Sequence, residues 1–147
     1  MEGEVILRAA TIDDAERLLQ WRNDAATRAA SHEQGPVDPS VHREWVERVL
    51  GDRDRVLMIA EVSHAAVGTV RADRDDTGWK LSWTVSPDSR GRGYGKPMVR
   101  QFMEQLSGSV WAEIRIGNEA SIRIAEGVGM ALKQEMDGVR SYRLDVR

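Results

Sequence analysis

A glycine-rich, basic segment between two apolar stretches carries the clearest chemical signal in the sequence. It runs from Arg90 to Lys96 and reads Arg-Gly-Arg-Gly-Tyr-Gly-Lys. A loop of this kind directs several backbone N–H groups to one place at the positive end of the helix that follows, which suits phosphate. Glycine allows the positive φ angles and the close approach that such a loop needs. The segment predicts a phosphate-binding loop, and a glycine-rich strand-to-helix turn is the alternative.

The spacing of this segment excludes two common phosphate sites. A P-loop requires Gly, four residues and then Gly-Lys-Ser/Thr, whereas residue 90 is Arg and residue 97 is Pro. The spacing of Gly91, Gly93 and Gly95 does not match the dinucleotide fingerprint. What remains is the pattern Arg-x-x-Gly-x-Gly, formed by Arg90, Gly93 and Gly95.

A second motif follows in segment 112–130, where an apolar strand leads to Asn118 and a short helix that Gly129 ends. Asn118 suits a helix cap, and capping alone is the alternative reading. On these two motifs and the order of elements, the sequence resembles the GNAT acetyltransferase superfamily. The resemblance implies transfer of an acetyl group from acetyl-CoA (coenzyme A) to a primary amine. It implies cofactor contacts from Trp83, Thr84, Val85, Arg90, Gly91, Arg92, Gly93, Tyr94, Gly95, Lys96, Asn118 and Ser121.

The reaction needs a proton acceptor, because an alkyl amine has a pKa of about 10 and attacks only when neutral. By the resemblance, a backbone N–H near Val85 of this chain would stabilise the oxyanion. By the same resemblance, Glu113 matches the position of the general base, with a solvent-facing carboxylate as the alternative. The family's usual acid is a Tyr where this chain has Ala125. Tyr142, or else Tyr94, is the expected substitute; unassisted loss of the thiolate and binding without catalysis are the other readings.

The acceptor is a small-molecule or peptide amine. Segments 19–24 and 42–45 are similar to a branch that acetylates nucleotide-linked amino sugars, which implies aromatic faces against a sugar and an Arg against a diphosphate. The alternatives are acetylation of a protein amino terminus, aminoglycosides, and a coenzyme A-binding module without catalysis. The residues expected to bind the acceptor are Arg22, His32, Glu33 and Trp79, with Arg28 and Arg43 as further candidates for the diphosphate.

The elements that must position these residues follow from the apolar periodicity. Strands are expected at 5–8, 56–62, 67–72, 79–85, 110–116, 131–136 and 142–146, and helices from Thr11, at 38–51, at 98–106 and at 120–128. This order predicts a single domain over 1–147 with a three-layer α/β/α architecture. The sheet is expected to be mixed and mostly antiparallel. By the resemblance, a bulge in the fourth strand should splay it from the fifth.

Composition excludes several other classes of protein. The chain has 147 residues, a net charge of −3, three histidines and no cysteine, which gives no support for a metal site and excludes disulfides. The weak charge gives no argument for nucleic acid as a partner, and no apolar run approaches the roughly 18 residues of a membrane span. The acidic start is unlike a signal peptide, so a cytoplasmic location is expected. A homodimer is a further expectation from the resemblance.

Overall fold

The computed structural model describes residues 4–24, 27 and 35–146. Its seven-stranded sheet has the order β1-β2-β3-β4-β5-β7-β6, and all neighbours are antiparallel except the parallel pair β4 and β5. The mixed, mostly antiparallel sheet confirms the prediction. The strands are β1 (Val5–Ala9), β2 (Arg55–Val62), β3 (Ala65–Asp75), β4 (Gly78–Val85), β5 (Gly108–Arg115), β6 (Ala131–Met136) and β7 (Val139–Val146).

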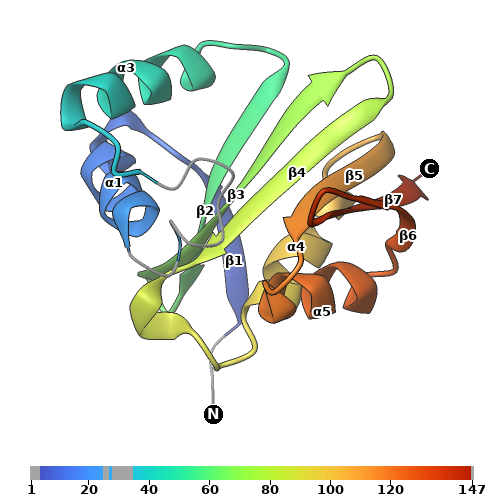
Figure 1. Ribbon diagram of the computed structural model, residues 1–147. Helices are drawn as coiled ribbons and strands as arrows, with labels where there is room; N and C mark the ends of the chain where they lie inside the picture. The colour runs from blue at the N-terminus through green and yellow to red at the C-terminus, as the bar shows by residue number, and fades with distance from the viewer. Residues whose placement is uncertain (1–3, 25–26, 28–34, 147) are drawn as a thin grey trace.

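Helices cover both faces of the sheet (Figure 1). The 3-10 turn η1 (Ile12–Asp14) and helices α1 (Ala15–Asn23) and α3 (Pro39–Leu50) lie on one face. Helices α4 (Gly95–Glu104) and α5 (Glu119–Gly127) lie on the other, and η2 (Pro87–Ser89) follows β4. Helix α3 begins as predicted, because Oδ1 of Asp38 accepts a hydrogen bond from the N–H of Ser40 at 2.9 Å and Pro39 occupies the first turn.

Two hydrophobic cores, one on each face, hold the three layers together. Strand β2 serves both, because Leu57 and Ile59 point to α1 and α3 while Ala60 and Val62 point to the other face. This is the two-residue alternation of a strand buried on both sides. The core under α4 and α5 includes Val70, Leu81, Met98, Phe102, Val110 and Ile122. The core under α1 and α3 includes Leu18, Trp21, Val46 and Val49. The three-layer prediction is thus confirmed.

Strands β4 and β5 separate soon after they meet. Their ladder contains only the register pairs Trp79–Val110 and Lys80–Trp111, so the gap opens from residue 81 onward. The predicted splay is therefore present. The predicted bulge in β4 is wrong, because the β3–β4 register runs without interruption from Gly68–Val85 to Asp75–Gly78. On its other edge, β5 pairs along its whole length with β7.

Two hairpin turns differ in part from the sequence-based prediction. The β2–β3 turn is only Ser63-His64, with φ of 51° and 68°, so β3 begins two residues earlier than expected. The Asp137-Gly138 turn is confirmed, with φ of 54° and 80°, but β7 begins at Val139 rather than at residue 142. Both are two-residue turns with two positive φ angles, the geometry that matches the twist of a hairpin.

Candidate active site

The glycine-rich segment forms an open loop that leads into α4. Gly91 and Gly93 have φ of 79° and 80°, and a Cβ atom on either would meet nothing within 4 Å. These two residues therefore provide the left-handed backbone of the loop beside open space. Gly95 has a different role. A Cβ there would lie 2.4 Å from Cδ1 of Ile124, so this glycine allows α4 to pack closely against α5.

A cleft of about 540 Å³ lies between the end of β4, the loop and α5. It contains eleven of the twelve residues predicted to bind the cofactor; the exception is Arg92. Oδ1 of Asn118 accepts a hydrogen bond from the N–H of Ser121 at 3.3 Å, so Asn118 also caps α5. The predicted residues lining the cleft are Trp83, Thr84, Val85, Arg90, Gly91, Gly93, Tyr94, Gly95, Lys96, Asn118 and Ser121. Arg123 on α5 also lines it and was missed, since a lone helix cation resembles ordinary solvent-facing charge.

The guanidinium of Arg90 is directed toward the end of α1. Its Nη2 donates to Oδ2 of Asp24 at 3.0 Å and to Oγ1 of Thr27 at 2.9 Å. The N–H of Thr27 chiefly, and Arg90 in addition, hold the pKa of Asp24 below its usual range against a smaller opposing effect of burial. Arg90 therefore ties the phosphate loop to the chain segment that follows α1.

A second cavity of about 310 Å³ lies under α1 and α3, on the opposite face of the sheet from α4. Trp83 and Thr84 line both this cavity and the cleft. The two spaces therefore lie next to each other at the splayed end of β4, with Trp83 and Thr84 between them. The cavity is lined by Leu18, Trp21, Arg22, Val37, His42, Trp45, Leu57, Thr69, Arg71, Ser82, Trp83 and Thr84.

The charged side chains of this cavity are positive. Its lining residues in the described part of the chain include Arg22 and Arg71 and no carboxylate. The Arg71 guanidinium lies 5.1 Å from the ring centroid of Trp45, and its Nε donates to Oδ2 of Asp73 at 3.1 Å. Thr69 and Arg71 were missed by sequence reasoning. Their signal was two polar residues alternating with buried Val70 and Ala72.

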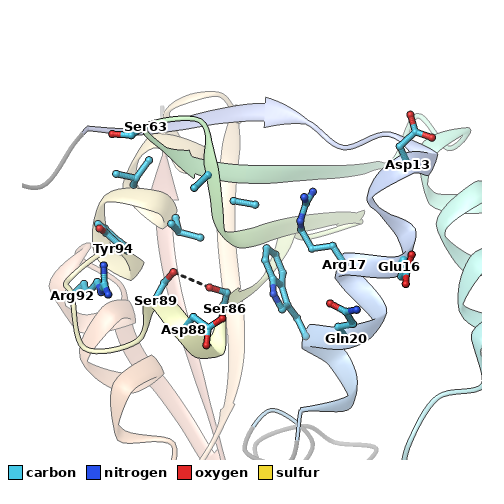
Figure 2. A pocket seen from close by; sticks show the side chains of 15 residues that line it. Asp13, Glu16, Arg17, Gln20, Ser63, Ser86, Asp88, Ser89, Arg92 and Tyr94 are labelled. Atoms are coloured by element: carbon cyan, nitrogen blue, oxygen red, sulfur yellow. Dashed lines mark hydrogen bonds between the residues drawn. The ribbon is translucent and has the colours of Figure 1, made fainter.

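A third and larger cavity, of about 1070 Å³, lies beside the phosphate loop (Figure 2). In Figure 2, α1 with Glu16, Arg17 and Gln20 lies on one side of this cavity, and the segment that carries Asp88 and Arg92 lies on the other. Its floor includes a hydrogen bond from Oγ of Ser86 to Oγ of Ser89 at 2.8 Å. This cavity mixes both signs of charge, and neither Trp83 nor Thr84 lines it. Arg92 lines this cavity and not the cleft.

The two predicted catalytic side chains lie outside these spaces. Nζ of Lys80 donates to Oε1 of Glu113 at 2.7 Å across the start of the splay, and Glu113 lines none of the three cavities. Tyr142 has 1% of its surface exposed and is packed in the core under α5. Its hydroxyl donates to Oε2 of Glu126 at 3.1 Å. Tyr142 lines none of the three cavities, and its role as general acid stays a prediction that its burial does not favour.

The residues predicted to bind the amine acceptor lie in different parts of the structure. Arg22 lines the 310 Å³ cavity. Trp79 does not, because it is 6% exposed in the core under α4 with the Arg74 guanidinium 4.5 Å from its ring centroid. Arg43 pairs with Glu47 at 3.7 Å on the exposed side of α3. His32 and Glu33, like Arg28, lie outside the described residues.

No group of three or more histidine or acidic side chains in residues 4–24, 27 and 35–146 could hold a metal ion. Within the same part of the chain, no helix is long and apolar enough to cross a membrane.

Comparisons with known proteins agree with this fold. A family model described as an acetyltransferase (GNAT) domain matches residues 4–131, and the chain belongs to that family. No curated protein matches the sequence significantly. A solved domain from Methanocaldococcus jannaschii is 19% identical, with a TM-score of 0.88 and coverage of 99% of this chain and 100% of that one.

Two further solved structures share the fold. Spermidine N-acetyltransferase from Vibrio cholerae, in complex with CoA and spermine, is 12% identical, with a TM-score of 0.85 and coverage of 97% of this chain and 95% of that one. Ribosomal-protein-alanine N-acetyltransferase from Brucella melitensis is 23% identical, with a TM-score of 0.81 and coverage of 96% and 99%. As a family member, the protein is an acetyl-CoA-dependent N-acetyltransferase.

Proposed function

We propose that this N-acetyltransferase acts on a small primary amine that also carries an anionic group, as nucleotide-linked amino sugars do. The observation that supports this most is the lining of the 310 Å³ cavity, which in the described part of the chain includes Arg22 and Arg71 and no carboxylate. Asp73, which pairs with Arg71, does not line the cavity. Guanidinium groups bind carboxylate and phosphate through paired hydrogen bonds. Because Trp83 and Thr84 line both the cavity and the cleft, an amine held in the cavity lies next to the proposed cofactor site.

The size and lining of the cavity favour a compact, partly apolar acceptor. Its volume lies at the lower end of the roughly 300–1,000 Å³ range of small-molecule sites. Three of the five tryptophans of the chain line it, namely Trp21, Trp45 and Trp83. Indole rings pack well against the faces of sugars and other rings. A polyamine such as spermidine would place positive charge beside Arg22 and Arg71, which is unfavourable.

The cleft fits acetyl-CoA, which supplies the acetyl thioester when bound. Gly91 and Gly93 leave open space beside left-handed backbone, and the N-terminus of α4 follows them, as a pyrophosphate requires. The backbone of Trp83 to Val85 borders the splay and would align the pantetheine arm, with the Val85 N–H directed at the reacting carbonyl oxygen. Asn118 and Ser121 close the opposite wall.

Two measurements test the proposal in sequence. Thermal unfolding with coenzyme A should show stabilisation of the wild type, and Gly93→Glu should lose it, because a side chain at φ of 80° distorts the loop. Thiol release should then be compared between glucosamine 6-phosphate and glucosamine, which differ only in the phosphate. A nucleoside diphosphate-linked amino sugar, spermidine and a peptide with a free amino terminus complete the panel.

We expect kcat/KM to be at least about tenfold higher for the phosphorylated sugar, since a charge-assisted pair is worth about 1.5–3 kcal/mol. Arg71→Gln should remove most of that preference, and Arg43→Gln, at an exposed arginine of α3, should keep it. Higher kcat/KM with the peptide would favour the protein amino-terminal alternative. Binding of coenzyme A without turnover of any amine would leave only the non-catalytic module.

A further inference from the structure

His42 is a buried residue in the lining of the 310 Å³ cavity, from here on called the acceptor cavity. The proposed function assigns no role to it. It is 7% exposed, lies in the first turn of α3 and lines the cavity. Its ring stacks on Trp45, with centroids 5.7 Å apart and planes inclined by 29°. Nε2 is buried and has no hydrogen-bond partner among the residues that the structure describes. Buried polar atoms are normally paired, so such an atom in a cavity wall indicates a place for a ligand.

The surroundings of His42 keep its ring neutral near pH 7. Burial chiefly lowers the pKa of His42 below 6.5; the backbone of Ala15 opposes this, and the positive charge of Arg22 adds to it. The charged groups that face it across the cavity are Arg22 on α1 and Arg71 on β3. In the tautomer with its proton on Nδ1, the neutral ring offers a lone pair at Nε2.

A second polar atom, on another residue that lines the cavity, also lacks a partner among the described residues. Nε1 of Trp83 is buried without a hydrogen bond to any described residue, and Trp83 separates the cavity from the cofactor cleft. An indole N–H is a donor only. The residues that line the cavity thus include an unpaired acceptor on α3 and an unpaired donor on β4, which matches a ligand with an amine and an oxygen atom.

We propose that Nε2 of His42 is the proton acceptor for the amine, a role that rests on the proposed function. The bound ammonium gives one proton to Nε2 and becomes a neutral amine. Its nitrogen then forms a bond to the thioester carbonyl carbon, and the C–S bond breaks. The proton that the nitrogen loses as the amide forms goes to the thiolate, and His42 later releases its own proton to water.

This assignment replaces Glu113 as the candidate general base. The Glu113 carboxylate accepts a hydrogen bond from Lys80, and Glu113 does not line the cavity. It also explains why α3, a helix remote from the cofactor loop in sequence, places a nearly buried imidazole against the acceptor. Turnover of the amine panel by the wild type tests the proposed function. The ratio of kcat for His42→Gln to kcat for the wild type tests the role of His42, so failure of one proposal can be told from failure of the other.

The kinetic test compares His42→Gln with His64→Asn and Glu113→Gln, using the best acceptor of the panel. His64 is an exposed histidine of the β2–β3 turn at φ of 68°, a conformation that Asn tolerates, so it is the matched control. We expect His42→Gln to lower kcat by about 10²-fold or more near pH 7, with unchanged stabilisation by coenzyme A. The loss should shrink as pH rises and free amine accumulates.

The acidic limb of the wild-type pH profile should fall below pH 6.5 and be absent from His42→Gln, because protonation of Nε2 removes the acceptor lone pair. A purely positioning role would raise KM and leave this limb in place, which would overturn the proposal. A larger kcat loss in Glu113→Gln than in His42→Gln would return the role to Glu113.

Nuclear magnetic resonance gives a readout independent of turnover and of how well His42→Gln folds. The three histidine ring signals can be assigned by elimination with His64→Asn and His32→Gln. We expect the His42 signal to titrate below pH 6.5 and to shift when the chosen acceptor is added with coenzyme A but without an acetyl donor. A His42 signal that the acceptor leaves unmoved at saturation would contradict the proposal.

Discussion

At the residue scale, Asp14 is the carboxylate with the most hydrogen bonds in the described fold. It is 3% exposed and accepts from Nη1 and Nη2 of Arg8, each at 2.8 Å, from Nη1 of Arg17 at 2.7 Å and from the N–H of Thr11 at 2.9 Å. Arg8 also donates to Glu61 at 2.9 Å. A buried carboxylate requires such partners. Here they join β1, α1 and β2 at the edge of the core under α1 and α3.

Replacing Asp14 by Asn should destabilise the fold by about 1.5–3 kcal/mol at pH 7, because the charge-assisted bonds of Arg8 and Arg17 are lost. The hydrogen bonds from Arg8 chiefly lower the pKa of Asp14 below 3.8, against the opposing effect of burial. The carboxylate therefore contributes stability above its unfolded pKa of about 3.9 and loses it as pH falls through the lower folded value.

Urea unfolding of wild type and Asp14→Asn at pH 7, 5 and 3 measures this effect. The difference in unfolding free energy should be full at pH 7 and 5 and decrease only in acid. Asp13→Asn, at the adjacent carboxylate, is the control and should stay within about 0.5 kcal/mol of wild type. A difference that does not depend on pH would show that the charge of Asp14 is not what stabilises the fold.

At the scale of elements, close packing of α4 on β3 and β4 fixes the wall between the two spaces. A Cβ on Gly68 would lie 2.6 Å from the carbonyl oxygen of Thr84 and 2.7 Å from Cε of Met98. Met98 could move its flexible end, but the Thr84 carbonyl belongs to the β3–β4 ladder. Since Thr84 lines both the cleft and the acceptor cavity, the packing of Gly68 positions that wall.

Gly68→Ala should therefore destabilise the protein by about 1–3 kcal/mol and lower kcat as well, because β4 must shift at Thr84. Denaturant unfolding and thiol release measure the two effects. Gly35→Ala is the control, since a Cβ there meets nothing within 4 Å, and it should leave both quantities near wild type. Wild-type stability of Gly68→Ala would mean that the strand yields more easily than close packing implies.

At the scale of the whole molecule, the sheet consists of two parts with a narrow connection. Strands β1 to β4 form one part and β5, β7 and β6 the other, and two register pairs between β4 and β5 join them. The contact of α4 with α5 adds a second connection on one face, seen in Figure 1. A ligand between the splayed strands would bridge the two parts.

Hydrogen exchange should detect that bridging. With saturating coenzyme A, amides of residues 82–85 in β4 and of the loop to residue 95 should exchange at least about tenfold more slowly, because the ligand adds partners and stabilises the closed state. Amides of the β6–β7 hairpin should change only as much as global stability does. Equal slowing at both places would contradict binding in the splay.

Local patterns made much of the fold predictable. Strand positions followed from two-residue alternation, helix starts from Asp38-Pro39 and Asn118, and the loop from its glycines, because each depends on residues close together in sequence. The errors in the starts of β3 and β7 were also local. The expected β4 bulge was different, because it came from the family resemblance and not from any residue of β4.

The sequence by itself determined the order of elements, the position of the glycine-rich loop and the family, since backbone preference and apolar periodicity are properties of short segments. Only the tertiary structure decided which side chains share a space. It buried Tyr142 and Trp79 in the core and paired Glu113 with Lys80. It brought His42, Arg71 and Trp83 from three elements to one cavity. The physical reason is that burial and charge pairing depend on which faces meet across the sheet, and no spacing along the chain specifies that.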